Sequence, residues 1–143
     1  MPGYGIETAD DGLLPWEWAR QRLAEAHNYW LATADKAGTP HLAAVWGVWH
    51  EDCFLFSTGT RSRKARNLSH RPHCSVALEG GAESVVVEGI ATQAGSPPDV
   101  ARLYAAKYGE GFPDPLWRVR PRTVIAVVEA AFITAATRWT FDD

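Results

Sequence analysis

The stretch that decides the fold reads FSTGTRSRKARNL and occupies residues 56–68. Its first residues close an apolar run, Gly59 follows in a loop, and Ser62 stands just before a helical pattern. Ser is a preferred N-cap residue, because its side-chain oxygen accepts a hydrogen bond from a backbone N–H of the first helical turn. The pattern therefore predicts a strand, a short loop and a helix over residues 63–70, which Pro72 ends.

The same stretch carries a positive charge that the whole chain does not have. The 143 residues hold 14 Lys and Arg against 17 Asp and Glu, a net charge of −3. Five bases lie between Gly59 and Cys74 without an acidic neighbour: Arg61, Arg63, Lys64, Arg66 and Arg71. A helix N-terminus favours anions, and Arg and Lys add charge-assisted hydrogen bonds. The hydroxyls of Thr58, Thr60 and Ser62 are further donors, so the segment predicts a phosphate site, too short and local for nucleic acid.

The flanking sequence predicts a single, mainly antiparallel β domain with three helices in its connections. At 46% apolar and 22% charged residues, the composition is that of one globular domain over residues 1–143. Residues 1–12 are expected to be loosely ordered. We expect strands over residues 29–34, 40–49, 53–57, 73–79, 84–93 and 123–140, and further helices over 16–27 and 100–108, the latter capped by Ser96. Long apolar strands joined as hairpins favour a small barrel.

Motifs for other chemistries are missing. The sequence has no GxxxxGK[ST] and no GxSxG, and Gly80-Gly81 reads as a hairpin turn. His50-x-x-Cys53 and His70-x-x-His73 match no familiar zinc module, so we predict no metal site. We identify no catalytic side chain. If the protein is an enzyme, a bound cofactor carries the chemistry.

The apolar runs also bear on location. None approaches the ~20 residues that a membrane-spanning helix needs, and no charged-then-apolar leader opens the chain. We therefore expect a cytoplasmic protein that has no membrane partner.

In its order of motifs the chain resembles the pyridoxamine 5'-phosphate oxidase-like split-barrel superfamily, and in particular its small flavin- or deazaflavin-binding reductases. The resemblance covers roughly residues 14–141. It rests on YWLAT (29–33), GTPHLAAVW (38–46), LFSTG (55–59), SRKARNL (62–68), VVVEG (85–89), WRVRP (117–121) and TRW (137–139).

The resemblance implies a homodimer of six-stranded antiparallel split β-barrels with a cofactor site at the dimer interface. By similarity, the second strand lies along the isoalloxazine-like ring, the strand end approaches the ribityl chain, and the helix start holds the phosphate. The corresponding residues are Ala44, Val45 and Trp46 for the ring, Ser57 and Thr58 for the ribityl chain, and Arg61, Ser62, Arg63 and Lys64 for the phosphate.

Two departures narrow the function. Leu42 and Gly47 stand where the oxidase branch has an Arg and a Lys, and the C-terminal motif that grips pyridoxal phosphate is missing, so pyridoxamine-phosphate oxidation is not expected. The Arg-rich segment resembles the branch that uses the deazaflavin coenzyme F420, which has an anionic oligoglutamyl tail. The arginines that remain for such a tail are Arg66, Arg71, Arg118, Arg120 and Arg122.

Three functions follow from the resemblance. The first is an F420-dependent oxidoreductase that transfers hydride to a small unsaturated substrate. The second is an FMN-binding oxidoreductase of the same fold. The third is a non-catalytic, haem-binding split barrel, in which His27 or His41 would ligate iron.

Overall fold

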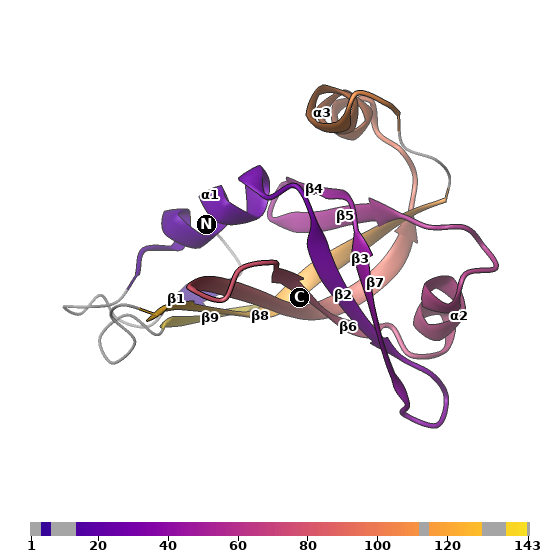
Figure 1. The fold of residues 1–143 in the computed structure, drawn as a ribbon, viewed down its shortest axis with the longest axis horizontal. Helices are drawn as coiled ribbons and strands as arrows, with labels where there is room; N and C mark the ends of the chain where they lie inside the picture. Colours follow the sequence, from indigo (N-terminus) through magenta and orange to yellow (C-terminus); the bar gives the residue numbers. More distant parts are fainter. Residues whose placement is uncertain (1–3, 7–13, 112–114, 130–136, 143) are drawn as a thin grey trace.

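The structure is a computed structural model that describes residues 4–6, 14–111, 115–129 and 137–142. These residues form three helices and nine strands (Figure 1). The helices are α1 (Trp16–Glu25), α2 (Arg63–His70) and α3 (Pro98–Tyr108). The strands are β1 (Tyr4–Ile6), β2 (Tyr29–Ala34), β3 (Pro40–Val45), β4 (Gly47–His50), β5 (Cys53–Ser57), β6 (His73–Leu78), β7 (Glu83–Ala94), β8 (Leu116–Val128) and β9 (Thr137–Phe141).

The strands form one curved antiparallel sheet in the order β1-β9-β8-β7-β6-β2-β3, to which the β4–β5 hairpin is joined. Strand β8 makes this junction. It pairs with β7 over its whole length, with β5 through Leu116–Val119, and with β9 through Thr123–Ala126. The result is a half-barrel, which agrees with the predicted antiparallel β class and its three helices.

The strand expected over residues 40–49 is in fact two strands. Residues up to Val45 pair with β2, whereas Gly47 onwards pair with β5, and Trp46 lies at the break. A Cβ at Gly47 would lie 2.3 Å from the Phe54 ring and 2.7 Å from the Leu55 carbonyl oxygen, so only glycine fits. An isolated glycine inside an apolar run is the signal of a bend or a close backbone approach, and it was available in the sequence.

The strand expected over residues 123–140 is also two strands. The two splits, together with β1, raise the strand count from the expected six to nine. β8 begins earlier, at Leu116, and β9 runs antiparallel to it, with Thr123 opposite Thr140. No Gly or Pro separates the two apolar runs, so the usual turn signal is missing between them. From the sequence we also expect a β-bulge at Ala130-Ala131, and these two residues lie outside the described ranges.

Two smaller expectations also differ from the structure. Residues 1–12 are predicted to be loosely ordered, and the structure describes only Tyr4–Ile6 of them. These three residues form a strand that pairs with β9. The N-cap of α3 is Pro97 and not the predicted Ser96, and no side chain makes a capping hydrogen bond there. Fixed φ makes proline suitable at a helix start without a capping side chain.

The helices belong to two apolar clusters. The main core includes Trp16, Ala19 and Leu23 of α1 with Ala65 and Leu68 of α2. A smaller cluster joins Val100 and Tyr104 of α3 to residues of β4, β5 and β8. In Figure 1 α1 and α2 lie at opposite ends of the sheet, and α3 stands over β4 and β5. No helix in the described ranges is long and apolar enough to cross a membrane.

Candidate functional site

Six of the nine predicted site residues line one pocket of about 390 Å³. These six are Ala44, Val45, Trp46, Ser57, Thr58 and Lys64. The pocket lies where β3 and β5 end and α2 begins. The sequence did not identify the two other lining residues, Asn28 before β2 and Tyr104 of α3.

One end of the pocket is the start of α2. The Ser62 Oγ accepts a hydrogen bond from the Ala65 backbone N–H at 3.0 Å, which confirms the predicted N-cap. The same oxygen accepts a hydrogen bond from Thr58 Oγ1 at 2.8 Å. Both hydroxyls are therefore occupied in building the helix start, and the side chain of Lys64 brings the positive charge into the pocket.

The three remaining predicted residues, Arg61, Ser62 and Arg63, do not line the pocket. The two arginines are exposed beside it at the helix start. In the described part of the chain, none of the five bases between Gly59 and Cys74 forms an ion pair with a carboxylate. Their positive field thus remains available to an anion at this helix start.

The other end of the pocket is aromatic. The Trp46 indole stacks on Tyr108 with ring centroids 4.5 Å apart and planes 7° from parallel. Its Nε1 donates a hydrogen bond to Asn28 Oδ1 at 3.1 Å. Tyr104 lies one helical turn before Tyr108, with its ring 4.8 Å away. The i, i+4 spacing of two tyrosines on the predicted helix was the signal that could have found this wall.

The strand break at Gly47 connects α3 to this wall. The Gly47 N–H donates a hydrogen bond to Tyr108 Oη at 3.0 Å, and Lys107 Nζ donates one to the Gly47 carbonyl at 2.9 Å. Lys107 also donates a hydrogen bond to the buried Tyr29 Oη at 2.7 Å. Burial lowers the pKa of Lys107 to about 8. The peptide that leaves the ladder at the break is thus satisfied by the last turn of α3.

Two histidines lie near the pocket without lining it. The His27 ring contacts Trp46 and Tyr108 edge-on, with centroids 5.5 and 5.0 Å away. Burial, together with the charges of Arg63 and Lys64, lowers the pKa of His41. In the residues that the structure describes, no three metal-ligating side chains gather in one place.

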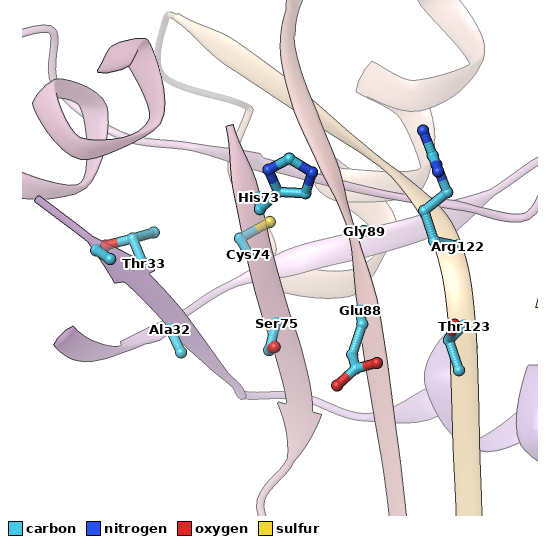
Figure 2. Close-up of a pocket in the computed structure, with 10 residues that line it drawn as sticks. Ala32, Thr33, His73, Cys74, Ser75, Glu88, Gly89, Arg122 and Thr123 are labelled. Carbon is cyan, nitrogen blue, oxygen red and sulfur yellow. The ribbon is translucent and has the colours of Figure 1, made fainter. Parts of the chain in front are cut away.

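A larger pocket of about 550 Å³ lies elsewhere, on β2, β6, β7 and β8 (Figure 2). Its polar residues include His73, Glu88 and Arg122, and none of the predicted site residues lines it. Cys74 is the only thiol there, and burial raises its pKa to about 12. Because the thiolate is the nucleophile, Cys74 stays inert near neutral pH. Arg122, predicted to contact a cofactor tail, lies at this second pocket.

Solved structures of low sequence identity share the fold. An F420 reductase is 21% identical with a TM-score of 0.57, and the match covers 73% of this chain and 94% of the reductase. For a pyridoxamine 5'-phosphate oxidase-related, FMN-binding protein from Nostoc punctiforme, the identity is 19%, the TM-score 0.58 and the coverage 80% and 84%. HutZ, the haem storage protein from Vibrio cholerae, is 20% identical with a TM-score of 0.59, and the match covers 74% of this chain and 87% of HutZ.

Sequence comparison identifies the family through a family model. No curated protein matches the chain. The family model described as pyridoxamine 5'-phosphate oxidase matches residues 16–135, which include both ends of the pocket. This chain therefore belongs to the pyridoxamine 5'-phosphate oxidase family.

Proposed function

We propose that the protein is an oxidoreductase that binds a phosphorylated flavin-type cofactor in the pocket between α2 and Trp46. Coenzyme F420 is the first candidate and FMN the alternative. One observation carries the proposal: a single pocket joins a cationic helix start at Lys64 to an indole at Trp46. A phosphate and a planar ring on one elongated molecule require that pairing of an anion site with an aromatic wall.

The residues present fit such a cofactor. Lys64 and the first backbone N–H groups of α2 would hold its phosphate, with Arg61 and Arg63 adding field from the rim. The ends of β3 and β5 form the middle of the pocket through Ala44, Val45 and Ser57. When bound, the cofactor supplies hydride transfer. The chain's own part is to orient the ring at Trp46 and leave room there for a small unsaturated substrate.

We also propose that the protein works as a homodimer through the outward face of β2 and β3. Trp30 lies opposite Ala44 and Ala32 opposite Leu42, so these side chains share one face. Trp30 is 39% exposed and Leu42 61% exposed. An apolar face of this kind favours a partner surface. Since Ala44 also lines the pocket, a second copy on this face would complete the cofactor site.

Direct titration with F420 and with FMN tests the cofactor proposal. We expect saturable binding at micromolar concentrations to the wild-type protein. Lys64→Ala should weaken binding about tenfold or more, since a hydrogen bond between charged groups is worth about 1.5–3 kcal/mol. Lys36→Ala, which removes an exposed lysine from the β2–β3 turn, is the matched control and should bind normally. If the wild type binds neither F420 nor FMN, the proposal is disproved.

Sedimentation measurements test the dimer. The wild type should sediment as a dimer, and Leu42→Glu should shift it to a monomer by burying a charge in the interface. Leu103→Glu is the control, because Leu103 is an exposed leucine, at 42%, on α3. A monomeric wild type would contradict the dimer and leave the cofactor proposal to its own test.

The likeness to HutZ favours one second candidate, a haem carrier without redox turnover. His27 stands beside the aromatic wall and His41 beside the α2 charges. Haem added to the protein would then give a Soret band that His27→Ala or His41→Ala shifts. A spectrum like that of free haem would exclude this candidate.

A further inference from the structure

The last turn of α3 is fastened to the backbone at the point where the pocket's indole begins. The Tyr108 Oη lies 2.8 Å from the His27 carbonyl oxygen and 2.9 Å from that of Gly47, and it also accepts the Gly47 N–H. Lys107 binds the same Gly47 carbonyl. Since Gly47 follows Trp46 directly, these bonds hold the peptide that carries the indole.

The indole itself is held from two further directions. Tyr108 covers one of its ring faces in a parallel stack, and the Asn28 side chain accepts a hydrogen bond from its Nε1. Of the two stacked rings only Trp46 lines the pocket. Trp46 as a whole is 39% exposed. The face that Tyr108 leaves open is therefore the one available to a ligand.

A stacked pair at 4.5 Å leaves no room for another ring between its members. A planar ligand must therefore use the open face of Trp46, in the pocket that Tyr104 also lines. The face of an indole is electron-rich, so it prefers a flat, electron-poor ring in an offset stack. Lys64, which would hold the phosphate of such a ligand, belongs to α2, whereas Tyr108 belongs to α3.

We infer that Tyr108 is a positioning residue for ring-bearing ligands: held by the backbone of Gly47 and His27, it fixes Trp46 so that an electron-poor planar ring stacks on the open face of the indole. This inference rests on the proposed function and names which part of the ligand α3 controls. It separates the pocket into a phosphate end that does not depend on α3 and a ring end that does.

The test compares ligands with and without a ring. Tyr108→Leu removes the stack and the hydroxyl, Tyr108→Phe removes the hydroxyl alone, and Leu103→Ala is an exposed control on the same helix. Each variant is titrated with FMN, with F420 and with inorganic phosphate, the last by competition. Tyr108→Leu loses the aromatic contact with Trp46 and is expected to bind FMN and F420 about 3- to 10-fold more weakly than the wild type. Tyr108→Phe keeps this contact, so its binding should weaken less. Phosphate binding should not change.

The ligand-free protein gives a second readout. The emission difference from Trp46→Phe reports Trp46, and acrylamide should quench this component more strongly once Tyr108→Leu uncovers the second ring face. Equal loss of FMN and phosphate binding would indicate general damage and overturn the inference, as would unchanged binding of both. A wild type that binds phosphate but neither FMN nor F420 would overturn the proposed function and the ring contact together.

Discussion

The two helices that meet at the pocket are anchored in different ways. Helix α2 is tied to the sheet through a buried hydrogen bond between Asn67 Nδ2 and Thr33 Oγ1, at 3.0 Å, and through Leu68 in the main core. Helix α3 packs in the smaller cluster and fastens to the backbone of Gly47 through Lys107 and Tyr108. The charged end of the pocket therefore rests on the main core, whereas the aromatic end rests on one strand break and a half-buried lysine.

The largest expected effect comes from placing a side chain at Gly47, where the strand breaks. Gly47→Val puts side-chain carbons where the Phe54 ring and the Leu55 carbonyl already lie, so we expect a loss of about 3 kcal/mol or more in unfolding free energy. Urea denaturation measures this. Gly59→Val is the control, because nothing lies within 4 Å of a Cβ at Gly59. Equal stability of both variants would mean that the break does not need glycine.

The next largest loss of stability is expected from breaking the hydrogen bond that anchors α2 to the sheet. Asn67→Ala leaves the buried Thr33 hydroxyl without its donor, and we expect a cost of about 1–3 kcal/mol. The double variant Thr33→Val with Asn67→Leu should recover part of this loss, since neither polar group then remains. Denaturation midpoints of Asn67→Ala, of the double variant and of its two single variants decide the matter, and purely additive losses in the double variant would contradict a direct coupling.

The N-cap of α2 should contribute less. Ser62→Ala removes the acceptor for the Ala65 N–H and for Thr58, and we expect a cost of about 1 kcal/mol. Thermal unfolding followed by circular dichroism measures it, with the exposed neighbour Thr60→Ala as the control. If Ser62→Ala unfolds at the wild-type temperature, the cap does not stabilise the helix start.

The smallest effect concerns the α3 anchor and depends on pH. The pKa of Lys107 is about 8 in the folded protein against 10.5 for an ordinary lysine, so between these values the unfolded chain binds more protons. Stability therefore rises as the pH increases above 8. Because Lys107 is only half-buried, we expect a gain of no more than about 1 kcal/mol between pH 7.5 and 9.5. Lys107→Met should lack this rise in urea titrations at the two pH values, and an equal rise in both proteins would assign it to another group.

Much of the α2 end was predictable from the sequence because its determinants are local. The Ser62 cap, the helix over residues 63–70 and the missing acidic neighbours are all set within a dozen residues. Local hydrogen bonds and charge do not depend on what packs against the segment. Lys64 lies in one pocket with Trp46, whereas Arg61, Ser62 and Arg63 lie outside its lining, and the assignment of these residues to a cofactor stays a prediction.

The α3 end was not predictable, because its contacts join residues far apart in the chain. The helix over residues 98–108 was expected, but nothing local places Tyr108 on Trp46 or Lys107 on Gly47, some 60 residues earlier. Pairing partners likewise decided where residues 40–49 and 123–140 break into separate strands. Apolar periodicity reports that a strand exists, but it does not report which neighbour the strand pairs with.

The sequence by itself determined the β-rich class, the order of elements and the cationic start of α2, since propensity, capping and charge act over a few residues. Only the tertiary structure decided that Trp46 sits at a strand break and that α3 covers one face of its indole. Both depend on the change of pairing partner, from β2 for β3 to β5 for β4, and on the close approach of the backbone at Gly47. Such long-range packing becomes visible once the whole sheet has been assembled.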